Sequence, residues 1–170
     1  MWARMKGSLD PLMLLGTGVH GKTLGIVGFG RIGQAVALRA QGFGMKVLYY
    51  DRQRLFPETE GQFGARYCEF DDLLRRSDFV TLHTVLDEAT HHLIDERAFA
   101  LMKRSAYLIN AARGPIVDEK ALVRALKTRR IRGAALDVYE LEPKTAAGLA
   151  QLPNTVIVPH MASASLETRT

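Results

Sequence analysis

The sequence of 170 residues lacks the features of disulfide-rich, membrane-spanning and metal-binding proteins. Cys68 is the only cysteine, so no disulfide can form within the chain, as suits a reducing cytoplasm. No apolar run approaches the ~20 residues of a membrane span, and the N-terminus has no signal-peptide layout. No cluster of His, Cys, Asp and Glu has the spacing of metal ligands. We therefore expect a cytoplasmic protein with no metal and no membrane partner.

The positive charge is also not gathered in the way that nucleic-acid binding requires. The 23 Lys and Arg residues exceed the 18 Asp and Glu residues by a formal charge of +5, but they are scattered along the chain. The exception, residues 127–132, lies at the end of an expected helix, where cations suit the helix dipole. We expect no nucleic-acid partner. The hydrophobic fraction of 47% and the charged fraction of 24% are ordinary for a globular domain with a core.

What the chain does contain is a glycine-rich turn in an informative context, within residues 23–51. An apolar run at 24–27 predicts a strand and leads directly into GFGRIG at 28–33. A helical pattern follows, and a second apolar run at 47–50 ends on Asp51. A lone G-x-G-x-x-G also occurs in unrelated turns, but strand, turn, helix and acid together are typical of a dinucleotide-binding unit.

Each key position of such a unit has a physical task in holding a dinucleotide. Gly28 permits the tight turn out of the strand, Gly30 lets a pyrophosphate approach the backbone, and Gly33 lets the helix pack close to the sheet. The free N–H groups at the start of the helix, together with its dipole, favour phosphate. Asp51 comes 18 residues after Gly33, where a carboxylate can accept the hydroxyls of an adenosine ribose.

Apolar runs alternate with helical patterns along the whole chain, without repeats or low-complexity tracts. This alternation predicts an α/β fold: a Rossmann-type, doubly wound parallel sheet with helices on both faces. Further strands are expected at 79–83, 106–110, 134–136 and 155–158, and a loop with a short helix at 52–64. Helices are expected at 31–43, with Ile32, Ala35, Val36 and Ala40 on one face, and after the capping residues Asp71, Asp95 and Asp118.

Polar residues recur where the expected strands end. They lie at or just past the carboxyl end of each strand: Asp51, His83, Asn110, Asp137 and His160. In open α/β sheets, ligands bind outside these ends of the strands. We therefore expect the five residues to converge on the cofactor crevice.

The loops at these ends contain the residue types that a nicotinamide enzyme needs to reduce a 2-keto acid. A guanidinium such as that of Arg113 can clamp a carboxylate and polarise the neighbouring carbonyl. A histidine such as His160 can exchange the alcohol proton near neutral pH. A carboxylate beside the histidine favours its protonated form and fixes its orientation, and both Glu140 and Glu142 are candidates by chemistry. Taken alone, Arg113 could equally be a loop arginine that pairs with a surface acid.

Four motifs together resemble the D-isomer-specific 2-hydroxyacid dehydrogenases, close to the branch of glyoxylate, hydroxypyruvate and 2-ketogluconate reductases. They are GFGRIGQAVA, INAARGPIVDEKAL, AALDVYELEP and a PH pair followed by SAS at 163–165. The similarity extends from residue 21 to the end of the chain. It implies an NAD(P)-dependent oxidoreductase that transfers a hydride between nicotinamide and C2 of a small 2-keto or 2-hydroxy acid. It also implies a homodimer built through this domain.

The resemblance also assigns roles to individual residues. It implies that Arg113 binds the substrate and that Glu142, which precedes a proline as in the family motif, pairs with the catalytic histidine, His160. Asp137 would hold the nicotinamide carboxamide. The cofactor-binding residues that the pattern and the resemblance imply are Gly28, Gly30, Arg31, Ile32, Gly33, Asp51 and Asp137.

The residues around Asp51 predict a preference for NAD(H) over NADP(H). A carboxylate at close range disfavours a 2′-phosphate on the adenosine ribose, because like charges repel. Arg52 and Arg54 follow Asp51 in the sequence, and arginines at this point can bind a 2′-phosphate. Use of NADP(H) therefore stays open on the sequence alone.

The sequence departs from the family pattern in its extent. We assign residues 1–20 to a lead-in segment, 21–163 to the dinucleotide-binding domain and 164–170 to the start of a truncated helix, with the family's substrate domain absent. Trp2 and the apolar residues at 12–15 are expected at a dimer contact. Such a chain should bind the cofactor but turn over substrate poorly. A redox-sensing NAD-binding module without activity and an inactive truncated product are the alternative interpretations.

Overall fold

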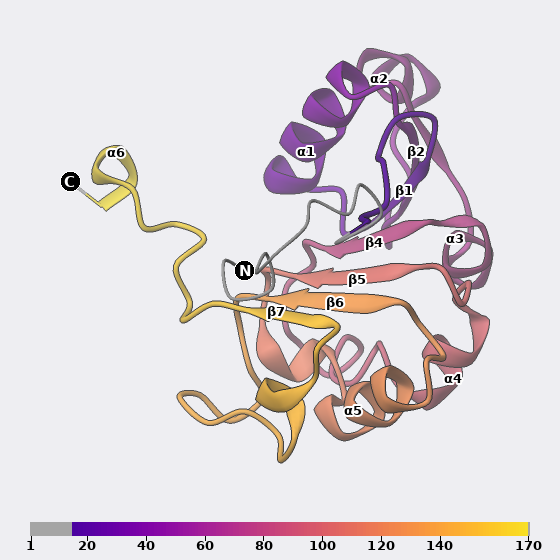
Figure 1. The fold of residues 1–170 in the computed structure, drawn as a ribbon. Helices are drawn as coiled ribbons and strands as arrows, with labels where there is room; N and C mark the ends of the chain where they lie inside the picture. Colours follow the sequence, from indigo (N-terminus) through magenta and orange to yellow (C-terminus); the bar gives the residue numbers. More distant parts are fainter. Residues whose placement is uncertain (1–14, 170) are drawn as a thin grey trace, which may run out of the picture.

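The computed structural model describes residues 15–169, which form one sheet of seven parallel strands with helices on both faces (Figure 1). The last short helix stands away from the sheet, at the end of an extended segment. Trp2 and residues 12–14 of the expected dimer contact lie outside the described residues. No helix in the described part is long and apolar enough to cross a membrane. The strands are β1 (Thr23–Val27), β2 (Lys46–Tyr50), β3 (Ala65–Tyr67), β4 (Phe79–Leu82), β5 (Tyr107–Asn110), β6 (Gly133–Leu136) and β7 (Thr155–Ile157). The helices are α1 (Arg31–Gly42), α2 (Pro57–Gln62), α3 (Phe70–Arg76), α4 (Glu96–Leu101), α5 (Glu119–Lys127) and α6 (Leu166–Arg169).

The strand order is β3-β2-β1-β4-β5-β6-β7, so the chain reverses its direction of travel across the sheet between β3 and β4. Strand β1 pairs with β2 on one side and with β4 on the other, for example through Gly25 with Leu48 and with Val80. In an open parallel sheet, a ligand crevice lies outside the carboxyl ends of the strands at such a reversal. The crevice is therefore expected beyond β1, β2 and β4. This topology confirms the predicted Rossmann-type α/β fold.

Alternate residues of strand β1 face two separate apolar cores. Ile26 belongs to a core that includes Ala37 of α1. Val27 belongs to the larger core, to which α3 contributes Leu73 and α5 contributes Leu122. Because successive side chains of a strand point to opposite faces, helices cover both faces of the sheet, as predicted. Removal of these apolar side chains from water is the main favourable term in folding.

The face that helix α1 turns to the sheet matches the prediction only in part. Its buried residues are Gly33, Ala37 and Ala40, and the half-buried Val36 packs against the same core. The prediction was therefore right for Val36 and Ala40 and wrong for Ile32, which is 66% exposed. The reason is close packing at the start of the helix. A Cβ on Gly33 would lie 2.3 Å from the carbonyl oxygen of Gly28, and only small residues fit along this contact. The bulkier Ile32 therefore lies outside it.

The sequence analysis missed strand β3, which lies at the edge of the sheet and pairs with β2. The strand has only three residues, and its central Arg66 is exposed. So short a segment carries too little alternation to be distinguished from the loop before it. The short helix expected within 52–64 is present as α2.

Two of the three predicted helix caps are confirmed. The carboxylates of Asp95 and Asp118 each accept a hydrogen bond from the backbone N–H three residues further on, at 2.7 and 2.9 Å. The prediction for Asp71 was wrong, because α3 already begins at Phe70 and Asp71 lies inside its first turn. There the Asp71 carboxylate pairs with Arg97 instead.

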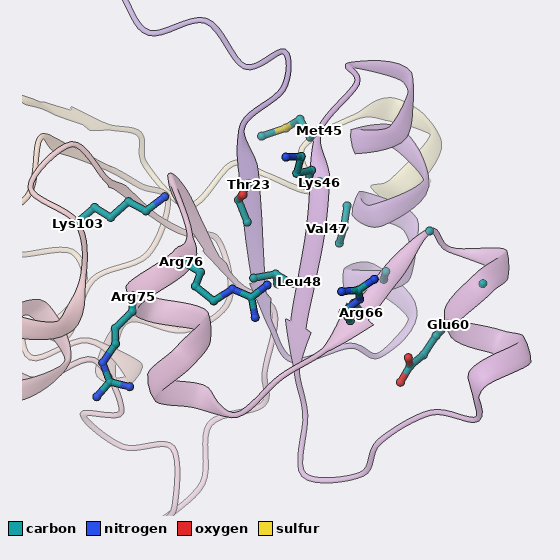
Figure 2. Close-up of a pocket in the computed structure, with 13 residues that line it drawn as sticks. Thr23, Met45, Lys46, Val47, Leu48, Glu60, Arg66, Arg75, Arg76 and Lys103 are labelled. Atoms are coloured by element: carbon teal, nitrogen blue, oxygen red, sulfur yellow. The ribbon is translucent and has the colours of Figure 1, made fainter.

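A hollow of about 840 Å³ opens at the amino ends of β1, β2 and β3 (Figure 2). All but one of its charged lining residues are basic: Lys46, Arg66, Arg75, Arg76 and Lys103, beside Glu60. All seven strands run in the same direction, so this hollow lies at the edge of the sheet opposite to the glycine-rich turn. It is therefore separate from the crevice expected at the carboxyl ends.

Candidate active site at the carboxyl edge of the sheet

The glycine-rich turn between β1 and α1 combines close backbone packing with open space. Gly28 has a φ of +89°, which L side chains rarely adopt, and a Cβ there would lie 2.5 Å from the backbone nitrogen of Thr84. At Gly30, by contrast, a Cβ would meet nothing within 4 Å. The fold thus requires glycine at position 28. At Gly30 it leaves free space beside the helix start, where a phosphate can approach the backbone.

Asp51, which directly follows β2, is tied to the same turn. Its Oδ2 accepts a hydrogen bond from the backbone N–H of Phe29 at 2.6 Å. The Phe29 ring stacks on that of Tyr49, with ring centroids 4.1 Å apart, so the turn and the end of β2 form one unit. A pocket of about 320 Å³ lies between this unit and the segment after β4, and its lining includes Gly28, Gly30 and Asp51.

The segment after β7 carries His160, whose ring pairs with Glu142 from the loop after β6. His160 Nδ1 lies 2.9 Å from Glu142 Oε2, and the backbone N–H of Tyr139 donates to Glu142 Oε1 at 3.1 Å. These hydrogen bonds, with that of His160 the stronger cause, hold the pKa of the Glu142 carboxyl below its usual range. The pair is half exposed, with 51% of the His160 side chain accessible. Because Nδ1 faces the carboxylate, Nε2 is the ring nitrogen left for a substrate.

Asp137, which directly follows β6, anchors the segment that carries His160. Its Oδ1 accepts a hydrogen bond from the N–H of Met161 at 2.6 Å, and its Oδ2 accepts one from the N–H of Ala162 at 2.9 Å. Its carbonyl oxygen accepts a hydrogen bond from the N–H of His160 at 2.9 Å. The sequence analysis expected Asp137 at the nicotinamide. In the structure this buried carboxylate uses both oxygens to hold the His160 segment in place.

Arg113 lies in an exposed position in the loop after β5. The buried Asn110 shapes this loop, because its side-chain N–H donates to the carbonyl oxygen of Arg113 at 2.9 Å and its Oδ1 accepts from the N–H of Ala112 at 3.0 Å. The next residue, Gly114, passes so close to the loop after β6 that a Cβ would lie 1.8 Å from the carbonyl oxygen of Tyr139. Among the described residues, the Arg113 guanidinium bonds only to the carbonyl oxygen of Ala112, at 2.7 Å.

The comparison with known proteins decides the family. Residues 2–162 match the model of the D-isomer specific 2-hydroxyacid dehydrogenase, NAD binding domain. The chain belongs to this family. It is 52% identical over 168 residues to a glyoxylate reductase of Thermococcus litoralis, in a match that covers 99% of this chain and 50% of that protein. The resemblance stated from the motifs is thereby confirmed.

Solved structures of this family have the same fold. A glyoxylate reductase from Paecilomyes thermophila is 45% identical with a TM-score of 0.86, in a match that covers 91% of this chain and 46% of that one. D-lactate dehydrogenase with NAD+ from Lactobacillus jensenii is 35% identical with a TM-score of 0.83, and the match covers 97% and 53% of the two chains. The chain spans about half the length of the curated relatives it matches.

The residues present fit the NAD that this family binds. The open space at Gly30 lies beside the first residues of α1, Arg31 and Ile32, which are both exposed. The only described partner of Asp51 Oδ1 is the N–H of Gln53, at a long 3.4 Å. The neighbouring pocket of about 320 Å³ is within the range of small-molecule sites. The phosphate and ribose groups of NAD would meet at this place the donors and the acceptor that they require.

The structure distinguishes Glu140 from Glu142, which were both candidates for the carboxylate beside His160. Glu142 faces His160, whereas Glu140 Oε1 lies 2.8 Å from Nε2 of His92. Glu140 Oε2 also accepts a long hydrogen bond from the backbone N–H of Glu119, the first residue of α5. The described part of the chain therefore contains two histidine–glutamate pairs, and the His92–Glu140 pair ties the segment after β4 to the loop after β6.

Supporting residues around the site were only partly recognised in the sequence. Tyr139 received no role, yet its hydroxyl donates to the carbonyl oxygen of Val158 at 2.6 Å and joins the ends of β6 and β7. Its position within AALDVYELEP was the available signal. His83 was expected at a strand end, and it lines the cofactor pocket with its ring on the Thr81 hydroxyl at 2.9 Å. Burial lowers the pKa of the His83 ring.

Proposed function

We propose that the whole protein is an NAD(H)-dependent oxidoreductase that reduces small 2-keto acids of the glyoxylate and hydroxypyruvate type to 2-hydroxy acids. The observation that carries this proposal is the hydrogen bond between His160 Nδ1 and Glu142 Oε2, at the same edge of the sheet as the glycine-rich turn. A positioned acid–base group beside a dinucleotide pocket is what carbonyl reduction needs. The printed name of the Thermococcus litoralis relative, glyoxylate reductase, supports the substrate class.

In this proposal NADH supplies the hydride that the substrate receives at C2. The chain's own residues bind the acid and move the proton. The exposed guanidinium of Arg113 binds the substrate carboxylate, and His160 gives a proton from Nε2 to the C2 oxygen. Glu142 holds the ring through Nδ1 and stabilises the positive charge that the ring carries before transfer. In the reverse direction, His160 Nε2 accepts the proton from the alcohol.

The remaining assignments concern the cofactor and the context of the domain. Residues 21–163 form the dinucleotide-binding domain after a lead-in at 1–20, and a substrate domain elsewhere in the whole protein covers Arg113 and His160. The protein acts in the cytoplasm as a homodimer through this domain, a contact supported by Leu15, which is 65% exposed. The cofactor-binding residues are Gly28, Gly30, Arg31, Ile32, Gly33, Asp51 and Asp137.

The test is NADH oxidation by the purified whole protein with glyoxylate, hydroxypyruvate, pyruvate and acetone. Pyruvate and acetone form a matched pair, because acetone has the carbonyl group but no carboxylate for Arg113. We expect turnover of about 1–10³ s⁻¹ with a 2-keto acid and none above background with acetone. NADH binding without turnover of any 2-keto acid would contradict the proposal and favour a redox-sensing module. Equal turnover of acetone would remove the role of Arg113.

A further inference from the structure

The two arginines that follow Asp51 have different partners, and Arg54 is directed away from the cofactor pocket. Its Nε donates to Glu60 Oε1 at 2.8 Å, and the Tyr49 hydroxyl donates to the same oxygen at 3.0 Å. The Arg54 guanidinium also lies over the ring of Tyr67, 5.5 Å from its centroid. Arg54 is not among the residues that line the pocket. Only Arg52 is therefore placed to meet a group on the adenosine ribose.

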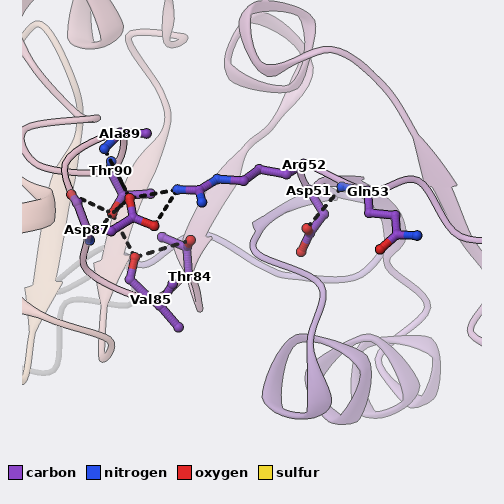
Figure 3. Close-up of polar contacts among 8 residues, drawn as sticks. All are labelled: Asp51, Arg52, Gln53, Thr84, Val85, Asp87, Ala89 and Thr90. Carbon is purple, nitrogen blue, oxygen red and sulfur yellow. Dashed lines mark hydrogen bonds and ion pairs between the residues drawn. The ribbon is translucent and has the colours of Figure 1, made fainter.

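Arg52 lines the pocket, but its charge is already engaged. Its Nη2 lies 2.6 Å from both carboxylate oxygens of Asp87 (Figure 3). This ion pair joins the end of β2 to the turn that follows β4, the two segments that border the pocket beside Gly28. Hydrogen bonding to Asp87 is the main reason why the pKa of Arg52 is raised, and the same bond lowers the pKa of Asp87. Both groups are therefore charged at neutral pH.

The Asp87 carboxylate is held in place by its own turn, independently of Arg52. Its Oδ1 accepts hydrogen bonds from the backbone N–H of Ala89 at 3.0 Å and from that of Thr90 at 3.1 Å. The Thr90 hydroxyl, on a residue that is 4% exposed, donates in turn to the carbonyl oxygen of Val85 at 2.7 Å. Asp87 is thus a fixed acceptor in the turn whose Ala89 and Thr90 line the pocket, and the long side chain of Arg52 reaches across to it.

A 2′-phosphate on the ribose would meet the Asp51 carboxylate and would need a nearby cation to offset the repulsion. Arg52 can supply that cation only by leaving Asp87. We propose that Asp87 is a specificity-determining residue, which keeps Arg52 from a 2′-phosphate and so directs the site to NAD(H). This inference rests on the proposed role of the pocket beside Asp51 as the adenosine site.

The test is a calorimetric titration of the 170-residue chain with NADH and with NADPH. It compares four proteins: the unchanged chain, Asp87→Asn, Arg52→Ala and the double variant. Asparagine keeps an Oδ1 that can accept from Ala89 and Thr90, so the turn is preserved. We expect Asp87→Asn to tighten NADPH binding about tenfold, as one released charge-assisted hydrogen bond would do, and to change NADH binding less than about twofold. Arg52→Ala alone should leave NADPH binding weak, and in the double variant the gain should disappear.

The control is Glu96→Gln, which removes the same charge from an exposed carboxylate that pairs with Arg124 and does not line the pocket. It should leave both affinities unchanged. Unchanged NADPH affinity in Asp87→Asn, with NADH still bound, would overturn the inference alone. A gain that persists in the double variant, or that Glu96→Gln reproduces, would overturn it as well, because loss of negative charge would then suffice. A folded chain that binds neither nucleotide would overturn the proposed function and the inference together.

Discussion

The two halves of the carboxyl edge differ in the groups that shape them: backbone groups in one half and exposed side chains in the other. On the cofactor side, beyond β1, β2 and β4, backbone groups set the geometry: the Phe29 N–H binds Asp51, and Gly28 packs directly against the segment after β4. On the catalytic side, beyond β5, β6 and β7, long side chains stand at the surface. Arg113 is exposed there, and half of the His160 side chain is accessible.

Each half can therefore perform a different step with the described residues. Backbone donors and a pocket meet the needs of a dinucleotide within the chain itself. An exposed guanidinium, by contrast, gains little from a carboxylate in water, and hydride transfer needs a site closed from water. We therefore expect the 170-residue chain to bind NADH well but to turn over 2-keto acids poorly. Substitutions can probe each half separately.

The largest effect is expected on the catalytic side, at His160. In the whole protein, His160→Asn should lower kcat ~10²–10⁴-fold, the usual contribution of a positioned proton donor, while NADH binding is kept. Asparagine suits the backbone here, because it tolerates the positive φ of 49° at this position. Steady-state kinetics with NADH and glyoxylate, together with an NADH titration, measure the two quantities.

The matched control for this variant is His92→Asn. His92 also has a positive φ, of 51°, and it also pairs with a glutamate, Glu140, at 2.8 Å. The proposed reaction does not use this ring, so kcat should stay near that of the unchanged protein. Equal losses of kcat in the two variants would show that the effect of His160→Asn does not come from proton transfer.

The next largest effect is expected on the cofactor side, at the glycine-rich turn. Gly30→Ala should weaken NADH binding on the order of 100-fold, because the methyl group fills the space for the phosphate. It should leave the melting temperature unchanged, since a Cβ at Gly30 meets nothing within 4 Å. Gly28→Ala should instead destabilise the fold, by about 1–3 kcal/mol from overpacking and more from its positive φ. Thermal unfolding and NADH titration of both variants separate the two roles, and a destabilised Gly30→Ala chain would contradict this division.

The sequence predicted the fold well wherever a physical signal repeats. Apolar runs between helical patterns located six of the seven strands, and the glycine-rich turn located the β1–α1–β2 unit. Strand β3 escaped because three residues carry almost no periodicity. The buried face of α1 was assigned wrongly at Ile32, because hydrophobicity favoured this residue, whereas the close approach to Gly28 favoured glycine at position 33. A local pattern of hydrophobic residues does not predict the distance between two packed elements.

For the site, too, the sequence predicted what local patterns carry and not which elements meet. Strand ends predicted which residues reach the carboxyl edge, because parallel strands bring those ends together. Partners at long sequence separation could not be read in this way. The pairing of Arg52 with Asp87, 35 residues further on, and the bonds from Met161 and Ala162 to Asp137 depend on loop geometry. Sequence chemistry therefore predicted the groups of the site and left their partners open.

A smaller effect is expected from the charge of Glu142. Its lowered pKa means that folding favours the carboxylate, so its contribution to stability is present at neutral pH. This contribution is lost as the pH falls below the ordinary value of 4.5 and through the lowered pKa. The difference in free energy of unfolding between the unchanged chain and Glu142→Gln should therefore be present above pH 4.5 and shrink below it. Urea unfolding across this range is the measurement, and a difference that persists undiminished under strongly acidic conditions would show that the carboxylate charge is not its cause.

The smallest effect is expected for Arg54→Ala, which tests whether the arginines beside Asp51 are equivalent. Arg54 is engaged with Glu60 and lies outside the pocket lining, so its removal should change the affinities for NADH and NADPH by less than about twofold. The melting temperature should fall, because Glu60 loses its cationic partner. The fall should be small, because the Tyr49 hydroxyl still donates to Glu60. Titration with both nucleotides beside thermal unfolding measures this. If Arg54→Ala weakened NADPH binding severalfold and spared NADH, Arg54 would turn toward a 2′-phosphate when the nucleotide binds, and cofactor choice would not depend on Arg52 alone.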